Sequence, residues 1–224
     1  EAERDQAAAR AARFVMKINL VTIFPDFFAT PLSLSIPGRA ASSGLVQYRV
    51  VDLREYTHDK HKTVDDYPFG GGGGMVMKPE PFFEAVEALA PKGPILLMSA
   101  RGRRFTHNDA VRLAVAAEIT LLCGHYKDVD QRVAEQLATD EVSLGDFVLS
   151  GGEFAALAIT DAVVRVLPGA LGTHAGAATQ TFSQPSWSTA PAPNHTEAAN
   201  RNLRRPISQI AARGTATLGA GGAA

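Results

Sequence analysis

The stretch SLGDFVLSGGEFAALAITDAVVRVLPGALG, residues 143–172, runs from a glycine-rich loop into a long apolar segment. Its apolar residues recur with helical spacing, and the Pro168–Gly169 pair is a typical helix stop. We therefore predict a helix from Glu153 to Leu167. Asp161 and Arg165 are four residues apart on it, which is the spacing of an ordinary ion pair within a helix.

The glycine-rich loop before this helix has two interpretations. Ser150 and Glu153 have the spacing of a capping box, in which each side chain closes a free backbone donor at the helix start. A cap needs at most one glycine, whereas the loop contains Gly145, Gly151 and Gly152. Surplus glycine indicates that the backbone closely approaches another group.

Upstream of this stretch, short apolar runs alternate with helical patterns. The apolar runs are predicted as strands at 17–24, 45–53, 94–100 and 119–124, and the helical patterns lie at 79–90, 106–118 and 130–138. Thr106 and Asp109 are spaced as an N-terminal cap. Continuous apolar strands alternating with helices predict an α/β domain, with a mostly parallel sheet that is covered on both faces.

Composition places the chain among ordinary globular proteins. Of its 224 residues, 46% are hydrophobic and 20% are charged, which argues against a disordered or fibrous protein. The single cysteine, Cys123, lies in an apolar run and excludes a disulfide framework, so we expect a reducing compartment. Residues 1–16 are predicted as an extension without the apolar core of a secretory signal. No apolar run is long enough to span a bilayer, and we expect a cytoplasmic protein without a membrane partner.

Charge is distributed unevenly along the chain. The net charge is -1, yet residues 173–224 carry four arginines and one acid. This segment is also poor in large apolar residues, and we predict that it is a linker and a C-terminal region that is partly disordered. A basic tail on an acidic body fits a polyanionic partner, although a solvated tail explains the charge equally well.

Three glycine-rich loops are candidates for ligand contact, since ligands of open α/β sheets bind beyond the carboxyl ends of the strands. They lie in YPFGGGGGMVM (67–77), CGHYKD (123–128) and SLGDFVLSGGEF (143–154). None matches a dinucleotide or phosphate-loop motif in its required place, which disfavours phosphate cofactors.

The stretch THDKHKTVDD (57–66) combines imidazoles, carboxylates and lysines. Its lysines would repel a divalent cation and its spacing is not that of a zinc site, so we predict no metal site there. Lys60 with His58 and His61 suits phosphate oxygens better, and a plain solvated loop remains an alternative.

Taken together, four motifs resemble the bacterial tRNA (guanine-N1) methyltransferases of the SPOUT class. They are VTIFPDFF (21–28), THDKHKTVDDYPFGGGGGMVMKPEP (57–81), LLCGHYKDVDQRV (121–133) and residues 143–172. The resemblance implies a deep trefoil knot in a catalytic domain spanning 17–172, and a homodimer with its active site at the subunit interface. It also implies S-adenosylmethionine as methyl donor, tRNA as partner, and possible use of Mg2+. The family's C-terminal tRNA-binding region would be abbreviated here to a short α-helical region within residues 173–224.

The resemblance also implies roles for individual residues. Arg165 would stabilise negative charge that develops toward O6 of the guanine, and Gln180 stands where the family's general base, an aspartate, is expected, with His174 as a conceivable replacement. Contacts with the donor are implied for Phe69, Gly71, Gly72, Gly124, Tyr126, Leu144, Gly145, Asp146, Phe147, Val148, Leu149, Gly151 and Gly152. Contacts with RNA are predicted for His58, Lys60, His61, Arg201, Arg204 and Arg205.

Some positions depart from the family pattern. His125, Lys127 and Asp128 stand where Arg, Glu and Gly are usual, and Gly73 stands where a proline is usual. The first hypothesis is an enzyme that methylates N1 of guanine 37 in tRNA. The alternatives are a donor-binding or RNA-binding relative without catalysis, and a SPOUT methyltransferase for another RNA position.

Overall fold

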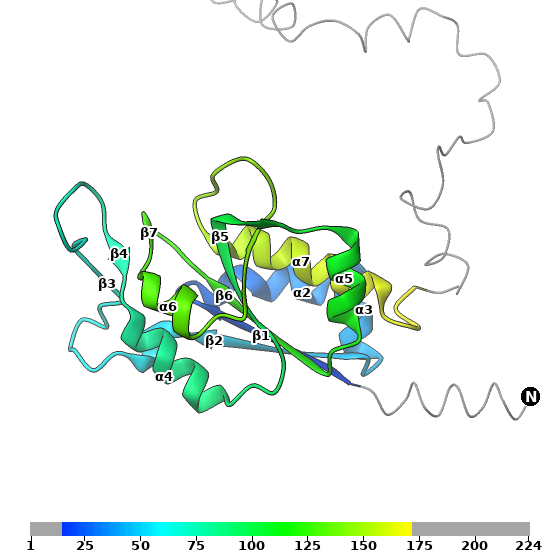
Figure 1. The fold of residues 1–224 in the computed structure, drawn as a ribbon. Helices are drawn as coiled ribbons and strands as arrows, with labels where there is room; N and C mark the ends of the chain where they lie inside the picture. The colour runs from blue at the N-terminus through cyan, green and yellow to red at the C-terminus, as the bar shows by residue number, and fades with distance from the viewer. Residues whose placement is uncertain (1–14, 172–224) are drawn as a thin grey trace, which may run out of the picture. The chain divides into compact units, whose positions relative to one another are not determined.

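A five-stranded sheet forms the centre of the domain (Figure 1). The computed structural model describes residues 15–171 of the chain. All neighbouring strands of the sheet are parallel. In spatial order they are β2 (Val46–Asp52), β1 (Met16–Thr22), β6 (Glu118–Cys123), β5 (Ile95–Arg104) and β8 (Asp140–Ser143). The predicted α/β class with a mostly parallel sheet is confirmed, whereas the trefoil knot stays a prediction.

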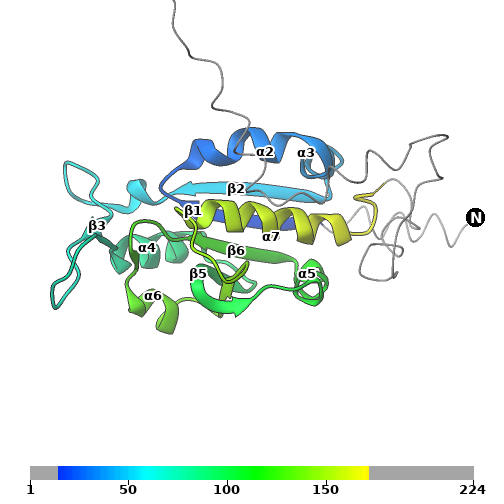
Figure 2. The same cartoon turned by 90° about the horizontal axis from the view of Figure 1, so that it is seen from above.

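Helices cover both faces of this sheet, as the continuous apolar strands predict. On one face α7 (Gly152–Val166) lies across β1 and β6, between α3 (Ser35–Ser42) and α5 (His107–Ala114) (Figure 2). On the other face lie α4 (Pro79–Leu89) and α6 (Gln131–Gln136). Alternate strand residues point to the two cores, so that Leu121 packs under α7 and its neighbour Leu122 packs under α4.

A smaller three-stranded sheet lies beside α4 and α6. It consists of β3 (Asp65–Asp66), β4 (Val76–Met77) and β7 (Asp128–Val129), with β4 antiparallel to β3 and parallel to β7. The five-glycine loop, residues 70–74, connects β3 to β4. Strand β4 therefore joins this loop to the segment that follows β6.

Most predicted elements are confirmed, with shifts at their ends. The capping box of Thr106 and Asp109 is present at the start of α5, although this helix ends at Ala114, four residues before the predicted end. Strand β8 was not predicted, because its four residues include two acids and only Val142 and Ser143 are buried. The short helices η1 (Pro25–Phe28), α2 (Ala29–Ser33), α3 and η2 (Leu53–Tyr56) were also missed.

The predicted terminal regions fall mostly outside the described residues. This applies to nearly all of the extension 1–16 and to the linker and C-terminal region 173–224. The domain boundary near residue 172 therefore stays a prediction. Everything below concerns residues 15–171 unless stated otherwise.

Candidate functional site

A cleft lies at the carboxyl ends of the parallel strands, where ligands of open α/β sheets bind. Three chain segments line it, each following or interrupting a strand of the large sheet. They are 98–101 from β5, 124–129 after β6, and the loop 144–151 with its flanks Ser143, Gly152 and Ala155. The cavity has a volume of about 130 Å³. The second and third predicted glycine loops thus come together.

The root of loop 144–151 is bound tightly to the end of β6. The Gly152 amide donates to the Gly124 carbonyl oxygen at 2.7 Å, and Gly151 forms an antiparallel bridge with His125. A Cβ atom on Gly152 would lie 2.8 Å from Cys123 Cα, inside normal contact distance. Gly151 and Gly152 therefore allow close approach to the protein's own backbone, which explains two of the surplus glycines.

Glu153 does not form the predicted capping box with Ser150. The N-cap residue of α7 is Gly151, without a side-chain hydrogen bond, and Glu153 points into the core, where it is 3% exposed. Its Oε1 accepts a hydrogen bond from Thr22 Oγ1 at 2.8 Å. Burial and the nearby Glu153 carboxylate raise the pKa of the Cys123 thiol, which fits its predicted role as a buried structural residue.

His125 lies against this carboxylate on the side of the cleft. Its Nδ1 atom is 3.7 Å from Glu153 Oε2 and is buried without a hydrogen-bond partner. The Phe24 ring lies edge-on to the imidazole, with the ring centroids 5.0 Å apart. The next residue, Tyr126, has a φ of 60°, which is rare for a residue with a side chain and common at functional sites.

Loop 144–151 presents apolar side chains to the cleft and to solvent. Leu144, Phe147, Val148 and Leu149 all line the cleft, and Val148 is 84% exposed. Gly145 and Asp146 belong to the loop but do not line the cavity. Leu144 and Leu149, for which donor contacts are implied, thus give the cleft an apolar side.

The five-glycine loop does not line this cleft. Four of its glycines have positive φ, from 85° at Gly71 to 108° at Gly72, so the backbone conformation itself requires glycine. Lys127 of the second glycine segment lies next to Gly72 and Gly74, and its amide donates to the carbonyl oxygen of Met75, which follows the loop. Phe69 is fully exposed, and the predicted convergence of three loops holds for two of them.

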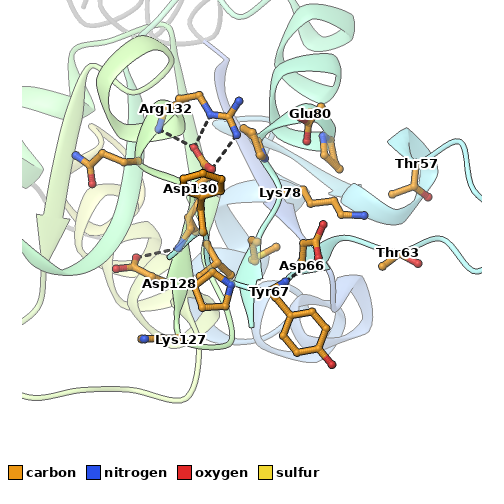
Figure 3. A pocket seen from close by; sticks show the side chains of 18 of the residues that line it. Thr57, Thr63, Asp66, Tyr67, Lys78, Glu80, Lys127, Asp128, Asp130 and Arg132 are labelled. Atoms are coloured by element: carbon orange, nitrogen blue, oxygen red, sulfur yellow. Dashed lines mark hydrogen bonds and ion pairs between the residues drawn. The ribbon is translucent and has the colours of Figure 1, made fainter. Parts of the chain in front are cut away.

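A larger cavity of about 830 Å³, shown in Figure 3, lies beside the cleft. Phe69 is among the residues that line it. Charged side chains of both signs surround it, among them Lys78, Lys127, Asp66 and Asp128. Arg101 pairs with Asp128 at 3.0 Å, and these residues line both cavities, so this ion pair is part of the wall between them.

Asp130 and Arg132 form a second ion pair on the rim of the larger cavity (Figure 3). Hydrogen bonds from the Arg132 side chain and backbone lower the pKa of the Asp130 carboxyl, although partial burial opposes this. Asp130 also accepts from the Arg132 amide at 3.0 Å and so starts α6. This pair therefore has a structural role and is less available for a ligand.

The residues predicted to contact RNA are exposed where the structure describes them. His58 lines the larger cavity and lies 2.9 Å from Glu84, while Lys60 and His61 are exposed on a turn. Asp59 holds this turn by accepting from the backbone of His61 and Thr63, and the latter bond above all lowers its pKa. Arg201, Arg204 and Arg205 lie outside the described residues.

Arg165 is on the last turn of α7, remote from the cleft. Thirteen residues separate it from Gly152 at the start of the helix, or roughly 20 Å along the axis. Within residues 15–171 the ion pairs do not include one between Asp161 and Arg165, so the predicted pair is absent and the guanidinium is available. Gln180 and His174 lie outside the described residues.

Sequence reasoning missed several residues of the site. Segment 98–101 enters the cleft because β5 bulges between Met98 and Arg103, and only Gly102 marks this irregularity in the sequence. Glu153 contacts Thr22, which lies more than 100 residues away in the sequence, and His125, which belongs to another loop. No local pattern could have revealed these contacts.

Residues 15–171 contain neither a membrane-spanning helix nor a cluster of metal-binding side chains. No helix in this part is long and apolar enough to cross a membrane. Within the same range, no three His, Cys, Asp or Glu side chains are grouped so that they could hold a metal ion.

Known proteins resemble this chain over most of its length. The family model described as tRNA (Guanine-1)-methyltransferase TrmD matches residues 16–211. A tRNA (guanine-N(1)-)-methyltransferase of Geobacillus kaustophilus is 48% identical over 171 residues, covering 75% of this chain and 70% of that protein. A tRNA (guanine-N(1)-)-methyltransferase of Koribacter versatilis is 48% identical over 198 residues, covering 85% of this chain and 75% of that protein.

A solved structure agrees with these sequence matches. The crystal structure of tRNA (m1G37) methyltransferase from Aquifex aeolicus superposes with a TM-score of 0.66 at 37% sequence identity. The match covers 79% of this chain and 76% of that chain. From the family match, which spans the sheet, the cleft and α7, it follows that this chain belongs to the tRNA (guanine-1)-methyltransferase TrmD family.

Proposed function

We propose that the chain transfers the methyl group of S-adenosylmethionine to N1 of guanine 37 in tRNA. The observation that carries this proposal is the family match over residues 16–211, which includes the whole cleft. Relatives at 48% identity carry the name of this activity, and the solved neighbour is an m1G37 methyltransferase. The reaction class is therefore methyl transfer to a nucleobase.

The chemistry of the cleft fits a sulfonium nucleoside. Segments 124–126 and 149–151 bring backbone donors and acceptors to the cavity, and Leu144 and Leu149 add apolar surface for a purine and a thioether chain. Its volume of about 130 Å³ is smaller than the ~300 Å³ at which small-molecule pockets usually begin. The tip of loop 144–151 must therefore move outward to admit the donor.

When bound, S-adenosylmethionine supplies an electrophilic methyl group. The protein must remove the N1 proton of guanine and stabilise the charge that develops at O6. Arg165 can stabilise the charge at O6, since it is a permanent cation without an ion-pair partner among residues 15–171. Gln180 cannot accept the proton as a carboxylate does, so the base is either His174 or a group still to be identified.

The position of Arg165 favours a homodimer. A side chain roughly 20 Å from Gly152 cannot reach a base bound beside the cleft of its own chain. Apolar side chains are exposed next to the cleft, among them Phe24 at 44% and Phe154 at 51%. An antiparallel pair of α7 helices about a two-fold axis would cover this surface and bring each Arg165 to the other chain's cleft.

The larger cavity and its surroundings suit the RNA. Lys78 and Lys127 line it, and His58 stands at its edge, so phosphates can be bound close to the donor cleft. Exposed aromatic rings at Tyr67 and Phe69 can stack on unpaired bases of the anticodon loop. Omission of Mg2+, with EDTA present, tests the metal dependence that the resemblance implies.

The deciding experiment follows methyl incorporation from labelled S-adenosylmethionine into unmodified tRNA. We expect incorporation into tRNA with G37 and none into the same tRNA with A37, with 1-methylguanosine in the digest. Donor binding without incorporation would favour a non-catalytic relative. Methylation that persists in the A37 tRNA would indicate another RNA position.

A further inference from the structure

The contact between His125 and Glu153 lies at the root of the loop that must move for the donor to enter. Gly151, the last residue of loop 144–151, lies between the two side chains. A Cβ atom there would collide with both Glu153 Oε2 and His125 Nδ1. The separation of imidazole and carboxylate is therefore coupled to the position of this loop.

Glu153 and His125 differ in the number of hydrogen bonds that their side chains make. Glu153 Oε1 accepts from Thr22 Oγ1, and this hydroxyl in turn accepts from the Phe24 amide, so its only proton points at the carboxylate. Glu153 Oε1 therefore acts as an acceptor for this hydroxyl. On the other side, His125 Nδ1 is buried and unpartnered at 3.7 Å from Oε2, just beyond hydrogen-bond distance.

The groups that face His125 from other elements are mostly neutral. Glu153 is the acidic neighbour from α7, and Cys123 comes from the end of β6. Phe24, which follows β1, packs edge-on against the ring, and Thr22 contacts Glu153 rather than the imidazole. Met77 from β4 accepts a hydrogen bond from the His125 amide through its sulfur. Tyr126 packs edge-on against the ring, and Lys127 follows in the same loop.

We propose that His125 and Glu153 form a proton-dependent latch, in which protonation of the imidazole fixes the root of loop 144–151 against β6. A neutral ring exchanges between two tautomers, and the one with its proton on Nε2 presents only a lone pair to the carboxylate, so that N–H stands at Nδ1 for only part of the time. A ring that takes a proton from solvent presents N–H at Nδ1 and can close the remaining gap as a charge-assisted hydrogen bond. The side chain is 24% exposed, so solvent can deliver this proton.

The latch has a consequence for the donor cleft. A fixed loop root leaves only the tip, residues 146–149, to be ordered when the donor binds, and this lowers the entropy cost of binding. Donor affinity should therefore rise as pH falls through the range in which histidine titrates. The affinity part of this inference rests on the proposed donor site, whereas the effect on the loop does not.

Two variants of the full chain separate the effect of a positive charge at position 125 from other effects of the side chain. His125→Arg keeps a cation at every pH, and His125→Gln keeps a polar side chain that never ionises. Without ligand, we expect hydrogen exchange of the Gly152 amide to be slower in His125→Arg than in His125→Gln by about fivefold or more. After correction for intrinsic rates, wild type should resemble His125→Arg at pH 6 and His125→Gln at pH 8.

Calorimetric titration with S-adenosylmethionine gives the second measurement. Wild-type affinity should tighten by about fivefold from pH 8 to pH 6, and both variants should be independent of pH. If amide exchange behaves as predicted but titration shows no donor binding, the latch is supported and the proposed donor site is overturned. The latch is overturned if the wild-type protein binds the donor but neither its affinity nor its amide exchange changes with pH. It is also overturned if His125→Gln shows the same pH dependence as wild type.

Discussion

Gly152 is held in place by the backbone of another segment. A Cβ atom there would lie 2.8 Å from Cys123 Cα and 2.9 Å from the Gly124 nitrogen, and neither backbone atom can move without disturbing β6. We expect Gly152→Ala to reduce the free energy of unfolding by about 1–3 kcal/mol, the usual cost of overpacking. Urea denaturation measures this change.

Gly73 provides the matched control. It has no heavy atom within 4 Å of an added Cβ and is not among the glycines with positive φ. Gly73→Ala should change the unfolding free energy by no more than about 0.5 kcal/mol. Equal destabilisation by both substitutions would contradict the packing explanation for Gly152.

In the proposed reaction, Gln180 occupies the position expected for the general base. A carboxylate at this position could accept the N1 proton, and general bases typically contribute 10²- to 10⁴-fold in rate. We therefore expect Gln180→Asp to raise the single-turnover rate of methyl transfer by about tenfold or more. Gln180→Asn, which offers no base, is the control. An unchanged rate with intact donor binding would mean that the base lies elsewhere, and His174→Ala would then be tested.

The sequence predicted which loops form the cleft, but it did not predict what the glycines of these loops contact. Gly145, Gly151 and Gly152 were singled out because a cap needs at most one glycine, and the surplus indicated close approach of the backbone to another group. Two of them, Gly151 and Gly152, serve contacts within the protein, and these depend on a loop meeting a strand end that is distant in sequence. The same distance concealed the role of Glu153, whose spacing from Ser150 fits a cap that does not form.

At the scale of elements, the start of α5 combines a cap with an ion pair. Asp109 accepts from Thr106 and pairs with Arg103 of β5 at 2.8 Å. Burial works to raise the pKa of Asp109, but the hydrogen bonds from Arg103 and Thr106 outweigh it and lower the pKa to about 2. Since its unfolded value is near 3.8, Asp109 stabilises the fold above pH 4, and this contribution is lost as pH falls toward 2.

Asp109→Asn tests this contribution. At pH 6 the variant should have a lower free energy of unfolding than wild type, by about 1–2 kcal/mol. The difference between the two proteins should shrink as pH falls from about 4 to about 2, where wild type also loses the charge. Glu135→Gln, on the exposed side of α6, should follow wild type throughout. A difference that stays constant with pH would exclude a charge effect.

Elements with a strong local pattern were predicted well. Strands β1, β2 and β6 lie within one or two residues of the predicted bounds, and α4 and α7 within one residue at each end. Strand β8 and segments 25–42 lack such a pattern, since they are short and their burial comes from tertiary packing. The order of the strands in the sheet follows from long-range pairing, which periodicity cannot predict.

At the scale of the whole molecule, the proposal of a shared active site rests on the length of α7. One end of this helix forms the cleft, and the other carries Arg165 roughly 20 Å away. If each site combines the cleft of one chain with the arginine of another, two inactive variants can complement each other. Arg165→Ala removes the cation, and Leu149→Lys places a charge on the apolar side of the cleft.

Each variant alone should lose nearly all methyl transfer, because both sites of its homodimer are defective. An equal mixture, unfolded and refolded together, should recover about a quarter of wild-type activity, since half of the dimers are mixed and each mixed dimer has one intact site. Size-exclusion chromatography with light scattering establishes that the refolded species are dimers. If Arg165 served its own chain, no mixed dimer would contain an intact site, and the mixture would remain as inactive as its components.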